Sequence, residues 1–255
     1  MRVALGLFGF IRISVDNICQ NFLHFINKLP IDTEIDIYIC CPETMYEFSD
    51  ELLDVNSIKT QLHKIFKNVY IKTFQYEPFR FIKKYKSLNY NFITQQNLYS
   101  YRFLSMHSNM SELSKYILES STIYDFSVLT RYDMLSQINN LGDIHRFTEQ
   151  NAIFIWRTCP YHSREHAEDR IIVTSKYGLE ILTNLYEGHS KLIISDAECY
   201  PEKILGKYLN LYEDLIKKDQ GIDMMLSPFK DAKYSVEVKN KCLELLQNYD
   251  TCVKL

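Results

Sequence analysis

The sequence predicts an α/β protein with a mostly parallel central sheet flanked by helices. Short apolar runs of strand length alternate with longer segments in which apolar residues recur at helical spacing. This order of strand, helix and strand is typical of parallel strands joined by right-handed crossovers. The composition, with 46% hydrophobic and 24% charged residues over 255 positions, is ordinary for a globular protein. We therefore predict a single domain over residues 1–255.

The elements follow from periodicity and from turn residues, in chain order. We predict strands over residues 2–8, 35–40, 69–74, 124–129, 152–156 and 169–174. We predict helices over residues 15–29, 94–119, 176–186 and 201–211, and a charged helical segment over the last 30 residues. Pro30 ends the first helix, because proline cannot continue a helical hydrogen-bond ladder.

The strand at 124–129 leads directly into a cation and a carboxylate, Arg131 and Asp133. In an open α/β sheet, ligands bind at the carboxyl ends of the strands. When a sugar is transferred from a nucleotide diphosphate, the diphosphate that leaves gains negative charge. A divalent cation or fixed positive side chains must stabilise this charge. We predict Asp133 as a ligand of Mn²⁺ or Mg²⁺, and Arg131 as a catalytic clamp on the phosphates. The alternative is a surface ion pair that only closes the strand.

A turn containing glycine follows the first strand. Gly6 and Gly9 would let backbone N–H groups approach a nucleotide, Phe8 would line the base slot, and Arg12 would reach the diphosphate. The turn has no G-x-G-x-x-G pattern, and the chain has no phosphate-binding loop of the G-x-x-x-x-G-K-[ST] type. The alternative makes Phe8 a core residue and Arg12 a solvated helix-start residue.

Ionisable residues crowd between the last two predicted strands, at 162–170. Asp169 starts the second of these strands and is our candidate for the general base that takes a proton from an acceptor hydroxyl. The alternative is that Asp169 only forms an ion pair with Arg170.

Several of these segments together resemble one family. Residues 124–133 (YDFSVLTRYD) resemble the "YD, apolar run, R-x-D" element of polysaccharide and lipopolysaccharide glycosyltransferases of the WavE-type group. Residues 3–12 are similar to its first strand and G-x-x-R turn, and 35–40 to its second strand. Residues 99–110 resemble the helix ahead of R-x-D, and 168–170 with 200–205 resemble its later acidic and P-E elements.

The resemblance implies a GT-A-like (Rossmann-like) fold, with a nucleotide-sugar-binding half at 1–134 and an acceptor-binding half at 135–255. It implies an enzyme that transfers a hexosyl or pentosyl group from a nucleotide sugar to a glycan or glycolipid acceptor in polysaccharide biosynthesis. The GT-A enzymes usually carry Asp-x-Asp, whereas this chain has Arg131 at the first acidic position. A sugar nucleotidyltransferase and a non-catalytic nucleotide-sugar or glycan-binding protein are the competing interpretations.

Charge and cysteine content narrow the remaining possibilities. A net charge of −3 argues against a nucleic-acid partner. No apolar run reaches the roughly 18 residues of a membrane span, although transient docking to a membrane-borne acceptor stays compatible with this. The seven cysteines include no C-x-x-C pair. We expect a reduced protein in the cytoplasm.

Overall fold

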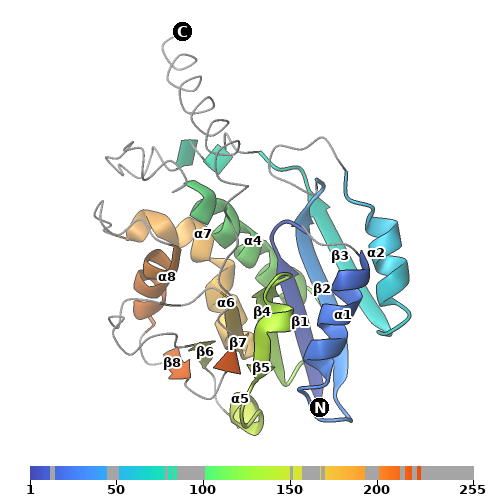
Figure 1. Cartoon of the computed structure of the whole chain (residues 1–255). Helices are drawn as coiled ribbons and strands as arrows, with labels where there is room; N and C mark the ends of the chain where they lie inside the picture. Colours follow the sequence, from blue (N-terminus) through green and yellow to red (C-terminus); the bar gives the residue numbers. More distant parts are fainter. Residues whose placement is uncertain are drawn as a thin grey trace.

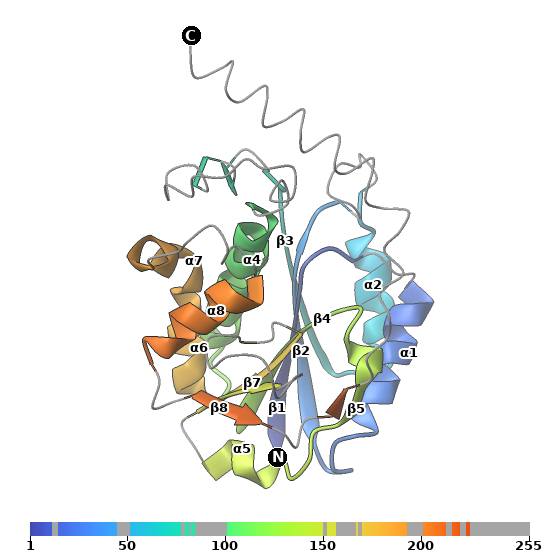
Figure 2. The ribbon, with the colours of Figure 1, turned by 60° about the vertical axis from the view of Figure 1, so that its left-hand side comes forward.

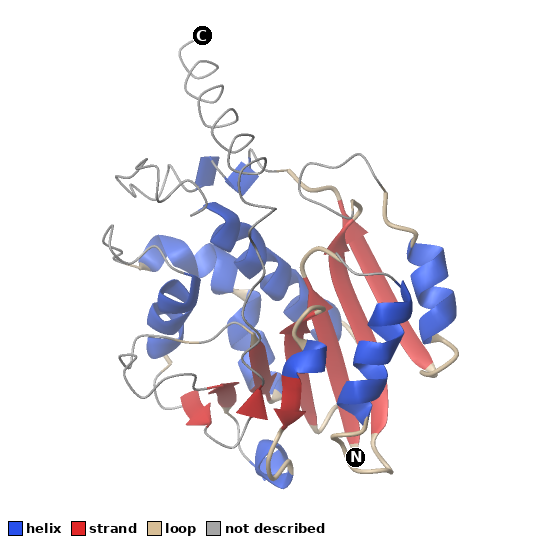
Figure 3. Ribbon diagram, in the orientation of Figure 1, coloured by secondary structure: helices blue, strands red, loops and turns tan. Residues whose placement is uncertain are grey.

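The computed structural model describes residues 1–11, 15–44, 52–77, 80–81, 83–84, 101–149, 152–156, 167, 170–192, 201–212, 216–219 and 223–224. Its main sheet contains β1 (Arg2–Phe8), β2 (Glu34–Pro42), β3 (Asn68–Phe74), β4 (Phe126–Arg131), β6 (Ile153–Trp156), β7 (Ile171–Thr174) and β8 (Ile216–Asp219). A second, small sheet pairs β5 (Ile138–Asn140) with β9 (Asp223–Met224). Figure 3 shows the strands gathered in one layer with helices beside them.

The main sheet has the strand order β3-β2-β1-β4-β7-β6-β8 (Figure 1). β1 pairs in parallel with both β2 and β4, and β2 pairs in parallel with β3. β7 is antiparallel to β4 and β6, while β8 is parallel to β6. The predicted α/β class with a mostly parallel sheet is confirmed, and strands from both sides of residue 134 join the same sheet.

The order of the strands creates a switch point in the middle of the sheet. The chain places β2 and β3 on one side of β1 and then returns to place β4 on the other side. The connections on either side of this point leave the carboxyl ends of β1 and β4 next to each other. In open α/β sheets, this is the position where ligands bind.

Helices cover both faces of the sheet, as Figure 2 shows. The helices are α1 (Val15–Ile26), α2 (Val55–Leu62), α4 (Tyr101–Leu118), α5 (His145–Glu149), α6 (Lys176–Thr183), α7 (Leu185–Gly188) and α8 (Pro201–Asn210), with short 3-10 turns at Leu135–Gln137 and His189–Lys191. Ile18, Phe22 and Phe25 of α1 are buried in the cluster on one face, as their helical spacing predicted. On the other face, α4 packs against the sheet through Met110, Leu113 and Ile117.

The structure differs from the prediction at the helix expected over 176–186. That helix is broken at Asn184, which ends α6 and precedes α7. The backbone N–H of Asn184 still donates to Ile181 and Leu182, but its φ of −98° and ψ of 2° leave the helical region. Residues 94–100 of the helix predicted at 94–119, and the charged segment at the end of the chain, lie outside the described residues.

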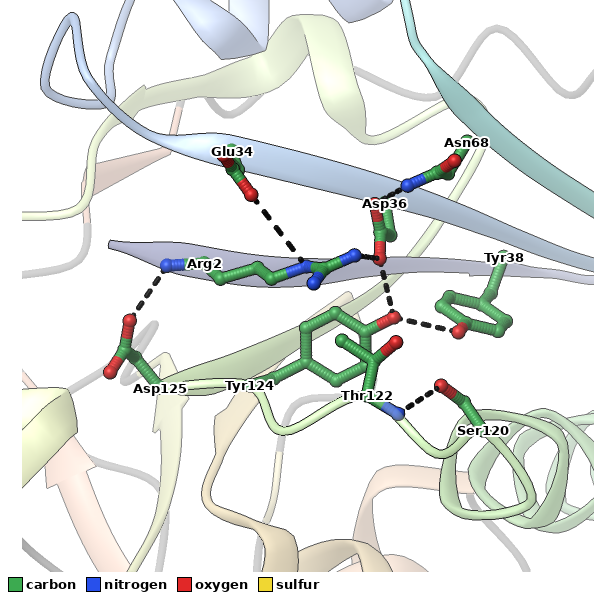
Figure 4. A network of polar contacts seen from close by, with 9 residues as sticks. All are labelled: Arg2, Glu34, Asp36, Tyr38, Asn68, Ser120, Thr122, Tyr124 and Asp125. Atoms are coloured by element: carbon green, nitrogen blue, oxygen red, sulfur yellow. Dashed lines mark hydrogen bonds and ion pairs between the residues drawn. The ribbon is translucent and has the colours of Figure 1, made fainter.

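A polar network closes the amino ends of the parallel strands (Figure 4). The buried carboxylate of Asp36 accepts hydrogen bonds from Arg2 Nη2 at 2.8 Å, Asn68 Nδ2 at 2.8 Å and the Tyr124 hydroxyl at 2.7 Å. The Tyr124 hydroxyl also lies 2.7 Å from that of Tyr38. One carboxylate therefore ties β1, β2 and β3 to the segment that leads into β4.

We expect Asp36→Ala to lower the free energy of unfolding by about 2–4 kcal/mol, because three hydrogen bonds to a buried charge are lost at once. For a chain of this size the melting temperature should fall on the order of 10 °C. Glu34→Ala is the matched control, since Glu34 lies 3.9 Å from Arg2 with a side chain 77% exposed. Thermal melts that show equal losses for the two variants would contradict a central role for Asp36.

None of the helices in the described part of the chain is long and apolar enough to cross a membrane.

Candidate functional site

The candidate site lies at the switch point, where β1 and β4 end side by side. Phe8, the last residue of β1, is the partner of Arg131, the last residue of β4. Beyond β1 the backbone turns at Gly9 with φ of +97°, a conformation that residues with a side chain rarely adopt. A Cβ on Gly9 would meet no atom within 4 Å. The structure thus brings Gly9 and the R-x-D residues to the same edge of the sheet.

Arg131 and Asp133 form a two-pronged ion pair at this edge. Arg131 Nε donates to Asp133 Oδ1 at 3.1 Å, and Nη2 donates to Oδ2 at 2.9 Å. The side chains are 27% and 48% exposed, so both are accessible from solvent. Between them Tyr132 points into the core beside Cys41, and burial raises its pKa. The buried tyrosine anchors the turn and leaves the guanidinium oriented toward the edge.

This geometry suits the guanidinium to a phosphate ligand. A guanidinium presents five N–H donors in a planar fork that matches the oxygens of a phosphate. A fixed orientation lowers the cost of ordering the side chain when the ligand arrives. The ion pair thus orients the Arg131 guanidinium at the edge of the sheet.

Gly6 and Phe8 lie inside β1 and not beyond its end. A Cβ on Gly6 would lie 2.8 Å from the side chain of Leu129 and 2.9 Å from that of Leu113. Phe8 is fully buried in the cluster beneath α4. Close packing of β1 against α4 explains both residues, so the core alternative describes Phe8.

Arg12 and Asp169 lie outside the described residues, so their predicted roles stay predictions. The chain neighbour of Asp169 is placed: the carbonyl of Arg170 accepts a hydrogen bond from Thr130 Oγ1 at 2.5 Å. Because β7 is antiparallel to β4, its first residue Ile171 pairs with Thr130 near the end of β4. Position 170 therefore belongs to the same edge as Arg131.

The described residues contain no group of three His, Cys, Asp or Glu side chains that could hold a metal ion. Mg²⁺ in phosphate-binding sites often takes only one or two carboxylates and fills its remaining positions with phosphate oxygens and water. Asp133 offers one carboxylate, whose two oxygens both accept hydrogen bonds from Arg131. Each oxygen keeps a second lone pair, so the carboxylate has capacity for a metal ion beside the guanidinium.

A row of aromatic rings extends from the end of β1 to α7. The ring centroids of Phe10 and Tyr76 are 5.0 Å apart, those of Tyr76 and Phe81 5.7 Å, and those of Phe81 and Tyr186 6.1 Å. We call these four residues the aromatic row. Aromatic and basic residues flank Phe81 in the sequence, but nothing in the sequence pairs them with Tyr186, about a hundred positions later.

Two histidines meet in the core near Tyr186, whose ring centroid lies 6.4 Å from that of His189. His107 Nδ1 lies 2.9 Å from His189 Nε2, and both residues are fully buried. Burial lowers the pKa of His107 well below its ordinary value, and the His189 ring adds to this effect. Burial lowers the pKa of His189 to about 3, with the positive charge of Lys84 acting in the same direction. Both imidazoles are therefore neutral in the folded protein at pH 7.

Comparison with known proteins gives fold-level likeness only. No protein-family model and no curated protein sequence matches the chain. The glycosyltransferase GlyE of Streptococcus pneumoniae TIGR4 has 11% identity over 86% of this chain, with a TM-score of 0.41. This chain spans 46% of the GlyE chain.

The galactosyltransferase LgtC, solved with donor and acceptor sugar analogues, has 10% identity over 97% of this chain and 96% of its own, with a TM-score of 0.43. An active-site mutant of LgtC reaches 12% identity and a TM-score of 0.44. At these TM-scores the likeness assigns no residue and no activity to the present chain.

Proposed function

We propose that this protein is a GT-A-like glycosyltransferase, which moves a sugar from a nucleotide-diphosphate sugar to a hydroxyl of a glycan or glycolipid acceptor. The observation that carries the proposal is the position of Arg131, oriented by Asp133 at the switch point between β1 and β4. The R-x-D resemblance described above supports the same assignment.

The reaction breaks the bond between the anomeric carbon and the β-phosphate oxygen, and it forms a bond from that carbon to the acceptor oxygen. The diphosphate leaves with the bonding electrons, and the acceptor hydroxyl loses its proton. Arg131 would stabilise the charge on the leaving diphosphate, because a pre-oriented cation acts where charge develops. Asp169 is the proposed base for the hydroxyl proton if the enzyme inverts the anomeric centre.

The metal part of the proposal assigns Mn²⁺ or Mg²⁺ to Asp133 together with the donor phosphates. Such an ion would supply Lewis-acid stabilisation of the leaving group. The turn at Gly9 would allow the nucleotide to approach the backbone closely, and Arg12 would contact the diphosphate.

Thermal melts with UDP, GDP, ADP and CDP, each with and without Mn²⁺, test this proposal, since a ligand of the native state raises its melting temperature. We expect a shift for one nucleotide that increases with Mn²⁺. Asp133→Ala should lose the Mn²⁺-dependent part, whereas Asp32→Ala, an exposed residue in the loop before β2, should keep it.

A rise in melting temperature with nucleotide that depends neither on Mn²⁺ nor on Asp133 would overturn the metal assignment. No shift with any nucleotide would overturn the nucleotide-sugar donor. Selective binding without release of the nucleoside diphosphate from its sugar conjugate would identify a non-catalytic binding protein.

A further inference from the structure

Two cations lie over the same ring at the end of the aromatic row. The Lys84 Nζ atom is 4.1 Å from the Tyr186 ring centroid, and the Arg80 guanidinium carbon is 5.4 Å from it. Arg80 and Lys84 come from the segment after β3, whereas Tyr186 comes from α7. Cation–π attraction therefore fixes two positive charges at a contact between distant parts of the chain.

This cluster belongs to the same edge of the sheet as Arg131. The segment that carries Arg80 leaves the carboxyl end of β3 at Phe74, and α4 begins at that edge because it leads back to the amino end of β4 (Figure 1). The aromatic row connects Tyr186 to Phe10, which is two residues beyond the end of β1.

The ammonium of Lys84 also donates to Glu187 Oε2 at 2.8 Å. The Lys84 side chain is only 18% exposed, whereas that of Glu187 is 72% exposed. An exposed carboxylate gains little net free energy from such a pair, because water solvates it well once it is released. Glu187 is therefore the partner that can leave, while Lys84 stays over the ring.

We infer that Arg80 and Lys84 form a binding site for a phosphate group. Glu187 is the internal counter-ion of Lys84 until that phosphate replaces it. Arginine offers two parallel N–H donors to phosphate oxygens, and lysine offers a compact charge beside them. In the proposed glycosyltransferase, on which this assignment of the ligand rests, the phosphate comes from the donor diphosphate or from a phosphorylated acceptor.

The exchange makes Glu187 a competitor of the ligand. Removing its charge should strengthen phosphate binding, and removing the charge of Lys84 should weaken it. A purely structural ion pair predicts no such opposite effects, because either change would then only loosen the contact between α7 and the segment after β3.

Calorimetric titration with inorganic pyrophosphate at constant ionic strength provides the test. We expect Glu187→Gln to bind several-fold more tightly than the wild type, and Lys84→Gln and Arg80→Gln to bind about tenfold more weakly. Lys84→Arg keeps the charge and should restore most of the affinity. Glu180→Gln and Lys115→Gln are charge-matched controls on exposed faces of α6 and α4.

Pyrophosphate affinities of Glu187→Gln and Lys84→Gln equal to those of their controls would overturn the inference. If Lys84→Gln folds poorly, the affinity of Glu187→Gln alone decides: an increase supports the inference, and no increase overturns it. A panel of UDP, GDP, ADP, CDP and glycerol 3-phosphate separates the two phosphate sources. Pyrophosphate binding that depends on Lys84, with no preference for any nucleotide, supports the inference and contradicts the proposed donor. Selective nucleotide binding that is unchanged by substitution of Lys84 and Glu187 supports the proposed donor and contradicts the inference.

Discussion

Arg131→Gln is expected to slow the release of nucleoside diphosphate by the proposed glycosyltransferase by about 10²- to 10³-fold, the usual effect of removing one pre-oriented group that stabilises developing charge. The ion pair with Asp133 at 2.9 and 3.1 Å means that the guanidinium needs little reorganisation when the leaving group becomes charged. Glutamine keeps a polar end group but is shorter than arginine and carries no charge. The loss should therefore fall mainly on kcat rather than on KM.

The measurement is steady-state diphosphate release from the nucleotide sugar whose base is selected in the thermal melts. Arg131→Lys should fall between the wild type and Arg131→Gln, because an ammonium keeps the charge and loses the two-pronged geometry. Lys64→Gln removes an equal charge after α2 on the far side of the sheet and should leave the rate unchanged. A rate for Arg131→Gln within twofold of the wild type would contradict a catalytic role of Arg131.

The second large effect concerns stability against pH. His107 and His189 remain neutral in the folded protein, because burial keeps the pKa of both low. After unfolding, each takes up a proton with a pKa near 6.5. The unfolded state thus binds more protons below that pH, so the stability is complete above pH 6.5 and is lost as the pH falls toward the low folded pKa values.

Between pH 7.5 and pH 5.5 the two histidines together should lower the free energy of unfolding by about 2.5 kcal/mol. Urea titrations at a series of pH values measure this slope. His189→Gln, which can still share a hydrogen bond with His107, should remove about half of it. His63→Gln, at the exposed end of α2, should leave the slope unchanged. If His189→Gln did not change the slope, the conclusion that both buried histidines are neutral would be contradicted.

The family-like segment at 124–133 divides into two parts with separate tasks. Tyr124 and Asp125 act at the amino end of β4, where Tyr124 donates to Asp36 and Asp125 accepts from the Arg2 backbone N–H at 2.7 Å. Arg131 and Asp133 act at the carboxyl end, where the candidate site lies. A motif that is continuous in sequence thus contributes to stability at one end of a strand and to the candidate site at the other.

The predicted site residues separate in the same way. Gly9, Arg131 and Asp133 meet at the edge because the ends of parallel neighbouring strands must lie side by side. Gly6 and Phe8 fall within the buried length of β1, the strand predicted over residues 2–8. The sequence did not show that α4 covers them in place of a ligand. The room for side chains on the face of β1 that Gly6 and Phe8 share is set by α4, which begins more than ninety residues after β1 ends.

The sequence by itself determined the fold class and most of the larger elements, because strand and helix periodicities of apolar residues are local properties that burial enforces on each segment. It did not predict α2, α5, β5, β8 or β9. It also determined that a cation and a carboxylate lie at the carboxyl end of a buried strand, although that strand covers Phe126–Arg131 and not 124–129. Only the tertiary structure decided that β7 runs antiparallel, that Asp36 gathers three donors, that two histidines share the core, and that Lys84 lies over Tyr186 beside Glu187. These contacts join residues far apart in the chain, and their partners are selected by packing and charge in three dimensions.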